Sequence, residues 1–291
     1  MLVFVTSMRH PRNATDYSYN EFLLRQTLES IALQTSSDYH VYVVGNREPD
    51  FSMGDKVTYV NVDFDPPAPV HGPHADRSGF VRDKGSKIGL GLIAAQEKNP
   101  DWVMIFDADD FVHRSIVSFV HDNPGSSGWV IRRGWVYSQA RNGYRKQDGF
   151  NGTCGTSHIL PYDAYAVPQG VSISSSQEEV LSAYGETLPA VLGAHRNAAA
   201  WFRERGVELR ELPFRGAVYH VDTGENHSGK ELRGVAKPWD RLLADEFGIP
   251  SSKKKAATIW RCIGPVALGQ SLASLFTRAL RRARQMFVRA N

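Results

Sequence analysis

The chain has 291 residues, of which 42% are hydrophobic and 22% are charged, and its formal net charge is +3. The composition is ordinary for a globular protein, and the length is enough for one large α/β domain or two closely fused halves. The two cysteines, Cys154 and Cys262, lie far apart, which argues against a disulfide framework or a zinc–thiolate site and fits a reducing cytosol. No apolar stretch reaches the roughly 18 residues that span a bilayer, so we expect no membrane-spanning helix.

The first 110 residues alternate between strand-like and helix-like patterns. In chain order we expect a strand, a helix, two strands, a helix and a strand, at Leu2–Thr6, Asn20–Gln34, His40–Val44, Val57–Val62, Lys84–Glu97 and Trp102–Phe106. The apolar run at the start is typical of a strand buried on both faces rather than of a signal peptide. Between residues 65 and 82, prolines and glycines predict a long loop. This order predicts a mostly parallel sheet covered by helices, with ligands bound beyond the carboxyl ends of its strands.

The second half is less regular, and the patterns predict three strands, two helices and a helical tail. The strands are expected at Trp129–Tyr137, Thr156–Leu160 and Gly216–Val221, the helices at Gln177–Ala183 and Arg196–Arg205, and the tail from about Lys237 onward. No internal repeat or low-complexity linker separates these parts. We therefore divide the chain into residues 1–115, residues 116–236 of the same domain, and a tail at 237–291.

An acidic cluster follows the most apolar strand, in the sequence Asp107-Ala-Asp109-Asp110. Carboxylates grouped at the edge of a sheet repel one another, so a cation is their natural partner. Hard divalent ions such as Mg²⁺ or Mn²⁺ prefer carboxylate oxygens and share them with substrate phosphates. The alternative is a solvated acidic turn that caps the following helix.

The cluster and its surroundings resemble a known family. The order strand–helix–strand, the helix with Asp83-Lys84-Gly85-Ser86-Lys87, and the apolar strand into the acidic cluster are similar to GT-A glycosyltransferases. The chain is closest to the family 2 type of polysaccharide and lipid-linked glycan synthesis. The stretch from Arg196 to Pro213 resembles that family's acceptor-side helix and next strand, and the stretch from Tyr219 to Gly229 resembles its closing segment over the donor phosphates.

The resemblance implies a fold and an activity. The fold would be α/β, a GT-A, Rossmann-like, mostly parallel central sheet flanked by helices, followed by an amphipathic helical tail. Residues 1–115 would bind the nucleotide sugar, and residues 116–236 would bind the acceptor. The activity would be metal-dependent transfer, with Mn²⁺ or Mg²⁺, of a sugar from a nucleoside diphosphate donor to a glycan or lipid-linked acceptor hydroxyl.

The resemblance also implies roles for single residues. Asp107 and Asp109 would contact the metal and the donor ribose, whereas Asp110 would orient the site or cap a helix. Further donor-binding residues would be Thr6, Arg9, Lys84 and Lys87. For the two lysines, whose charge would offset that of the nucleotide phosphates, a solvated helix face is the alternative.

At the start of the acceptor-side helix the sequence departs from the family. Inverting members carry an acidic pair there, and this chain has His195-Arg196. A histidine can remove a proton from a sugar hydroxyl near neutral pH, so His195 is a candidate general base and Arg196 a candidate contact for an anionic group. A retaining reaction, a pair without a chemical role, and a base among Asp163, Glu178 and Glu179 remain open.

The closing segment departs from the family as well. A histidine there often serves as a further metal or phosphate ligand, and here His227, His220 and Asp222 compete for that place. We expect His227, because it stands in a polar, loop-like stretch that has no packing reason to exist. His220 is expected on a strand, where a histidine is more often a satisfied core residue.

The end of the chain is strongly basic. Residues 251–291 hold nine basic residues and no acidic one, whereas the first 250 hold 25 basic and 31 acidic residues. From Leu272 to Ala290, apolar residues share one helical face and arginines lie opposite. We expect residues 270–291 to dock on an anionic membrane surface, which places the protein in the cytoplasm, peripherally on the inner face of the membrane. The alternative is a helix packed on its own acidic domain.

Three rival functions fit parts of the sequence. A haloacid-dehalogenase-type phosphatase also carries an Asp-x-Asp motif after an apolar strand, but here no later acidic pair completes its site. A sugar-binding pseudoenzyme requires that His195 and Arg196 have no catalytic role. A nucleic-acid-binding protein is disfavoured, because the body is acidic and the aromatic residues of the tail do not alternate with its arginines.

Overall fold

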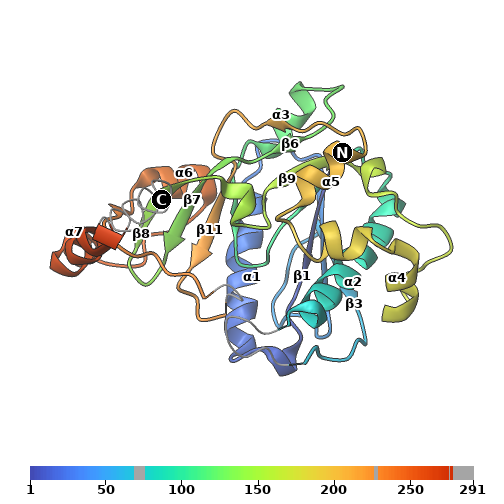
Figure 1. Ribbon diagram of the computed structural model, residues 1–291, viewed down its shortest axis with the longest axis horizontal. Helices are drawn as coiled ribbons and strands as arrows, with labels where there is room; N and C mark the ends of the chain where they lie inside the picture. Colours follow the sequence, from blue (N-terminus) through green and yellow to red (C-terminus); the bar gives the residue numbers. More distant parts are fainter. Residues whose placement is uncertain (69–75, 226–228, 275, 278–291) are drawn as a thin grey trace, which may run out of the picture.

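The computed structural model describes residues 1–68, 76–225, 229–274 and 276–277. Two sheets lie side by side with helices around them (Figure 1). The strands are β1 Leu2–Ser7, β2 Tyr39–Gly45, β3 Val57–Asn61, β4 Trp102–Ile105, β5 Phe111–Val112, β6 Trp129–Val130, β7 Arg133–Ser138, β8 Gly143–Asp148, β9 His158–Pro161, β10 Arg210–Glu211, β11 Ala217–Val221 and β12 Lys237–Pro238. The helices are α1 Tyr17–Ala32, α2 Ser78–Ala95, α3 Ile116–Asp122, α4 Gln177–Tyr184, α5 Ala198–Glu204, α6 Arg241–Phe247 and α7 Lys255–Ile263.

The larger sheet has the strand order β10-β6-β9-β4-β1-β2-β3. Its strands run parallel except β9, which pairs antiparallel with both β4 and β6. The expected α/β class with a mostly parallel central sheet is therefore confirmed. Since β6, β9 and β10 come from the second half of the chain, the two halves share one sheet.

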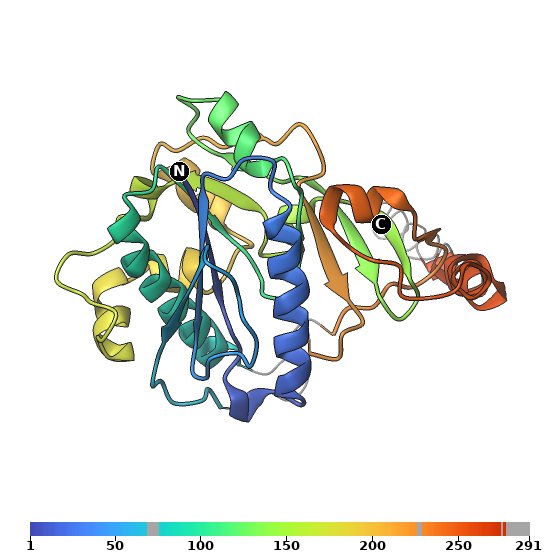
Figure 2. The same cartoon turned by 180° about the vertical axis from the view of Figure 1, so that it is seen from behind.

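The first strand shows why helices cover both faces of this sheet. Successive side chains of a strand point to opposite faces. Leu2 and Phe4 pack in the core that α1 covers, whereas Val3 and Val5 pack in the core that α2 covers. Figure 2, seen from behind Figure 1, brings α1 to the front of the sheet. The unbroken apolar run of β1 is thus the pattern of a strand that is buried on both sides.

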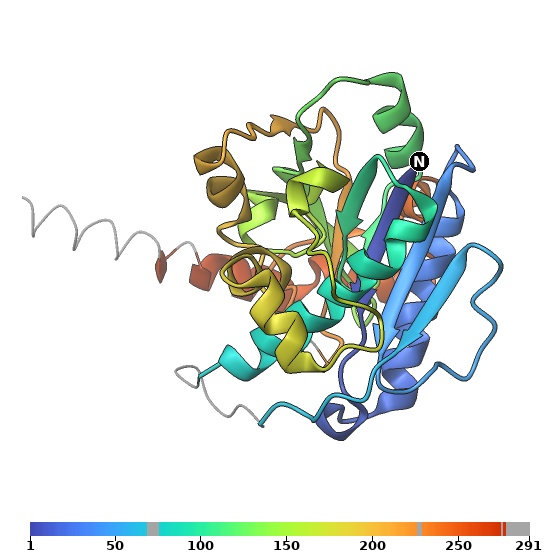
Figure 3. The same cartoon turned by 90° about the vertical axis from the view of Figure 1, so that its right-hand side faces the viewer.

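The smaller sheet has the order β12-β8-β7-β11-β5, and α6 packs on it through a separate apolar core. After α7 the chain is again helical at residues 265–274 and 276–277. Figure 3 shows this end projecting from the body. The expected helical tail is thus seen as far as residue 277, and the rest of the amphipathic pattern lies outside the described residues. No described helix has both the length and the apolar character that crossing a bilayer requires.

Three sequence expectations are wrong in detail. The strand expected at Trp129–Tyr137 is two strands, β6 and β7, which belong to different sheets. The chain passes from one sheet to the other after Ile131, whose N–H donates to the O atom of Ser157, the residue before β9 (2.8 Å). Helix α2 begins at Ser78, not at Lys84, and the tail starts with the short strand β12 before its helices.

Candidate functional site at the carboxyl edge of the large sheet

Asp107 follows the end of β4 and is held by three neighbours. Its carboxylate forms an ion pair with Lys84 of α2 and accepts a hydrogen bond from Gly155 N–H (3.1 Å), and its own N–H donates to Thr156 Oγ1 (2.9 Å). A Cβ on Gly155 would lie 2.6 Å from Asp107 Oδ2, so any larger residue here would displace the Asp107 carboxylate. Burial opposes the charge of Asp107, but Lys84 outweighs it and lowers the pKa below its usual value.

Asp109 lies beside Asp107 and behaves in the opposite way. Burial and the negative charge of Asp107 raise the pKa of Asp109 to about 7. The positive charge of Arg9 acts to lower the pKa of Asp109. The pKa of Tyr19 is raised mainly by burial and also by the negative charge of Asp109. Arg9, which precedes α1, and Tyr19, at the start of α1, therefore both interact electrostatically with Asp109.

Asp110 is fully buried and connects the two sheets. Its Oδ2 accepts hydrogen bonds from Thr156 Oγ1 (2.5 Å) and Cys154 Sγ (2.8 Å), which both precede β9. Its Oδ1 accepts one from the backbone N–H of His220 on β11 (3.2 Å). Asp110 thus ties the chain after β4 to segments that are distant along the sequence, and its expected role in orienting the site stays a prediction.

The described residues bring Asp107 into a group that could hold a divalent ion. Possible ligand atoms of Asp107, Asp110 and Cys154 lie within 4.8 Å of one another. The oxygens of Asp110 and of Asp107 already accept protein hydrogen bonds, and burial raises the pKa of the Cys154 thiol, which favours its protonated form. Asp109 is not part of this group, so a site at Asp107 and Asp109, which would offer hard oxygen ligands and relieve their mutual repulsion, stays a prediction.

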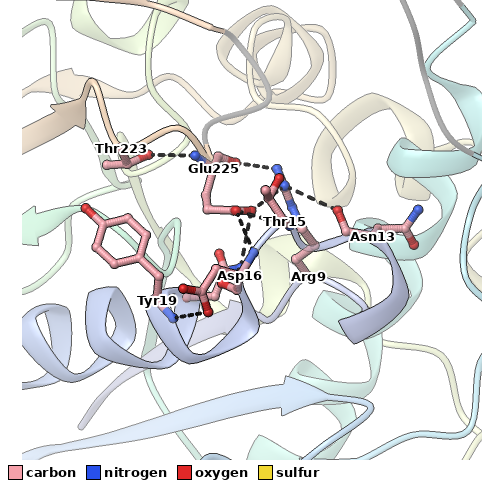
Figure 4. A network of polar contacts seen from close by, with 8 residues as sticks. Arg9, Asn13, Thr15, Asp16, Tyr19, Thr223 and Glu225 are labelled. Carbon is pink, nitrogen blue, oxygen red and sulfur yellow. Dashed lines mark hydrogen bonds and ion pairs between the residues drawn. The ribbon is translucent and has the colours of Figure 1, made fainter.

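Arg9 is fixed by Glu225, a residue that the sequence patterns did not single out (Figure 4). Arg9 Nη1 lies 2.7 Å from Glu225 Oε2, and this glutamate is buried. The same carboxylate accepts hydrogen bonds from the N–H groups of Thr15 and Asp16 (3.1 Å each) and from Asn20 Nδ2 (3.3 Å). The chain after β11 is therefore tied to the start of α1, and Arg9 is held next to Asp109.

The other expected donor-binding residues are placed differently. Lys84 contacts Asp107, but Lys87, one turn further along α2, is fully buried and pairs with Asp83 (2.9 Å). Lys87 also donates to Met8 O (3.1 Å), so it supports the loop after β1. Thr6 is buried on β1, and its Oγ1 has no hydrogen-bond partner among the described residues.

His195 lines a small pocket together with Lys84 and Gly155, both of which contact Asp107. Burial lowers the pKa of His195 to about 4, although the nearby charge of Asp107 acts in the other direction. Its imidazole is therefore neutral at physiological pH, and the same burial makes it a weaker proton acceptor than an ordinary histidine, whose pKa lies near 6.5. Arg196, the next residue, is exposed.

The alternative bases are exposed. Glu179 completes the N-terminal cap of α4, where its carboxylate accepts from Ser176 N–H (2.7 Å), and Glu178 is paired with Arg82. Asp163 lies at the protein surface. Of these candidates, only His195 lines the pocket beside Lys84.

The three candidates for a further metal or phosphate ligand lie in different surroundings. His220 is buried on β11, and its ring centroid lies 5.5 Å from that of Phe111. Asp222 is left-handed (φ +62°), and its carboxylate accepts from Leu232 N–H (3.2 Å). His227 lies outside the described residues. Its role therefore stays a prediction.

Burial of His220 predicts a stability effect that depends on pH. Burial lowers the pKa of His220 to about 4. The folded state therefore favours the neutral ring. The contribution of this preference to the free energy of unfolding is complete above the usual pKa near 6.5 and is lost as the pH falls towards 4. Below about pH 6, wild type should lose about 1.4 kcal/mol of unfolding free energy per pH unit relative to His220→Gln. Urea unfolding measures this difference, with His121→Gln at an exposed histidine as control; a difference that does not change with pH would contradict the assignment.

The sequence matches no family model and no curated protein. Among solved structures, the chain resembles the galactosyltransferase LgtC in complex with donor and acceptor sugar analogues (13% identity, TM-score 0.33, covering 76% of this chain and 73% of that one). It also resembles a nucleotide-diphospho-sugar transferase from Desulfovibrio desulfuricans G20 (10%, 0.31, 75% and 80%) and mouse xyloside xylosyltransferase 1 (10%, 0.33, 79% and 98%). At these TM-scores the resemblance is distant, and the function of the chain therefore has to be argued from its own residues.

Proposed function

We propose that the chain is a metal-dependent glycosyltransferase of the GT-A type. It would move a sugar from a nucleoside diphosphate donor to a hydroxyl of a glycan or lipid-linked acceptor. The observation that carries this proposal is the acidic pair Asp107 and Asp109 at the carboxyl edge of a mostly parallel sheet, with Lys84 and Arg9 beside it. Ligands of such sheets bind at this edge, and a diphosphate needs both a cation site and basic side chains.

The proposed roles of the residues follow from charge. When bound at Asp107 and Asp109, Mn²⁺ or Mg²⁺ would offset the negative charge of the diphosphate. Lys84 would keep Asp107 ionised and contribute its own positive charge to the pocket that it lines. Arg9, fixed by Glu225, adds a second positive charge beside Asp109.

His195 is the proposed proton acceptor. Transfer forms a bond between the acceptor oxygen and the anomeric carbon, and it breaks the bond from that carbon to the diphosphate. The proton of the acceptor hydroxyl would pass to His195, whose ring is neutral and lies beside Lys84. Arg196, exposed next to it, would contact an anionic group of the acceptor.

A panel of nucleotide sugars with Mn²⁺ tests the proposal. We expect one donor to raise the melting temperature only when Mn²⁺ is present and to be hydrolysed slowly when no acceptor is added. A chain that no donor stabilises, and that instead turns over a generic aryl phosphate, would favour the phosphatase. Donor binding without hydrolysis or transfer to any acceptor would favour the sugar-binding pseudoenzyme.

We further propose that the end of the chain docks on an anionic membrane from the cytoplasmic side. Four large apolar side chains of this end, Trp260, Val266, Leu272 and Phe276, are between 67% and 75% exposed. Cys262 and Ala267, on the same part of the chain, are buried. Apolar side chains directed at solvent, on a segment with nine basic residues and no acidic one, are the pattern of an interfacial helix.

Flotation with liposomes tests the docking. The full chain should float with vesicles of phosphatidylglycerol, and the variant Leu272→Ser/Phe276→Ser should bind about tenfold less, because it lacks two exposed apolar side chains that would enter the membrane. The variant Phe22→Ser/Ile173→Ser, which removes two exposed apolar side chains far from this segment of the sequence, is the control. If both variants float like the full chain, the membrane role is wrong.

A further inference from the structure

A small pocket next to the acidic cluster contains a second histidine. His158, on β9, lines this pocket together with Lys84, Gly155 and His195. His158 is 6% exposed, and burial lowers its pKa to about 3, so its ring is neutral. The sequence patterns gave no reason to select it, because it stands in an ordinary strand.

Two nitrogen atoms in this pocket have unfulfilled hydrogen-bonding capacity. Nε2 of His158 and Nε2 of His195 are both buried, and neither has a hydrogen-bond partner among the described residues. Buried polar atoms are almost always paired, with protein or with an ordered water. The pocket volume is about 20 Å³, and a cavity of roughly 10–15 Å³ on the same measure already holds one water.

We propose that His158 is a positioning residue for His195 and acts through one water between the two Nε2 atoms. A bound cation in this place is disfavoured, because the ammonium group of Lys84 lies at the same pocket. A water needs polar partners, and the two imidazole nitrogens provide a donor and an acceptor for it. This inference rests on the proposed role of His195 as the proton acceptor.

The contact made by the other ring nitrogen of His158, Nδ1, sets the direction of the hydrogen bonds through the water. Its Nδ1 lies 3.1 Å from Ser157 Oγ, which can accept an Nδ1–H. In that tautomer His158 Nε2 carries a lone pair and accepts a hydrogen from the water, and the water oxygen accepts the Nε2–H of His195. The proton of His195 is then on its enclosed nitrogen, and its Nδ1 keeps the lone pair that a proton acceptor requires.

Nitrogen-15 NMR of the imidazole rings tests the tautomer without any activity assay. In the wild-type protein we expect His195 to carry its proton on Nε2, with its signals assigned by loss in His195→Gln. In His158→Phe the His195 ring should become a mixture of tautomers. A wild-type His195 protonated on Nδ1, or a ring unaffected by His158→Phe, would overturn the inference.

Kinetics of the full-length enzyme give the second test. His158→Phe should lower kcat about tenfold to a hundredfold with KM for the donor nearly unchanged. His158→Gln should restore most of kcat, because its amide can still bond the water. The control Tyr165→Phe alters the same pocket wall and should behave as wild type. A KM effect without a kcat effect would overturn the positioning role.

The two proposals fail separately. If no donor is bound or turned over, the glycosyltransferase proposal fails, while the NMR result still decides whether His158 orients His195. If transfer is found and His158→Phe transfers as fast as wild type, the positioning role fails and the enzyme assignment stands.

Discussion

Asp109→Asn is expected to lower sugar transfer about a hundredfold or more while the protein stays folded. The amide has the shape of the carboxylate but lacks its charge, so the proposed site at Asp107 and Asp109 would bind a divalent ion more weakly and offset less of the charge on the leaving diphosphate. Removing one of two repelling carboxylates should not destabilise the fold, because the raised pKa of Asp109 shows that its charge is costly there. The transfer rate at saturating Mn²⁺ and the donor-dependent rise in melting temperature measure the effect.

Asp122→Asn is the matched control for this experiment. Asp122 is an exposed acid at the end of α3, and its replacement should leave both transfer and donor binding unchanged. If Asp109→Asn transferred as fast as wild type and bound Mn²⁺ equally well, the acidic pair would not be a metal site, and the central proposal would be wrong.

Replacement of the neighbouring acid, Asp110, should instead destabilise the fold. Asp110→Leu is expected to lower the free energy of unfolding by about 3 kcal/mol or more, because it leaves buried donors without acceptors. Those donors are Thr156 Oγ1, Cys154 Sγ and the His220 N–H. Urea unfolding at neutral pH, with the slope checked for two-state behaviour, measures the loss.

Two further variants separate the hydrogen bonds from the charge. Asp110→Asn keeps one carbonyl acceptor, and the rotatable hydroxyl of Thr156 can accept from its amide, so its cost should be well below that of leucine. Thr156→Val removes one of the three bonds to Asp110 and also the acceptor of the Asp107 N–H, so it should cost about 2 kcal/mol. If Asp110→Leu were as stable as wild type, Asp110 would not connect the two sheets.

The large sheet and its flanking helices could be predicted from local patterns. The unbroken apolar run of β1 and the helical spacing within Asn20–Gln34 each reflect burial that a short window of sequence records. Strand β8, Gly143–Asp148, was missed because its residues are polar and half of them face solvent. It is a strand because it pairs with β7 along its whole length, which no local pattern reports.

The site was predictable only in part, for the same reason. Lys84 and Lys87 stand three residues apart on one helix, yet Lys84 pairs with Asp107 and Lys87 with Asp83. Glu225 was not selected, since its partner Arg9 lies 216 residues away along the chain. The polar stretch that starts at Glu225 was the available signal, and it pointed to the next histidine instead.

The sequence by itself determined that Asp107, Asp109 and Asp110 stand at the carboxyl end of a buried strand, because the strand and the turn after it are local structures. Only the tertiary structure decided that burial and the charge of Asp107 raise the pKa of Asp109. It also decided that Asp110 accepts hydrogen bonds from Cys154, Thr156 and the β11 backbone. The same holds for His158, whose place beside His195 arises where β9 enters the large sheet next to β4. Burial, charge and hydrogen-bond partners depend on segments brought together by folding, and these separate one carboxylate or histidine from the next.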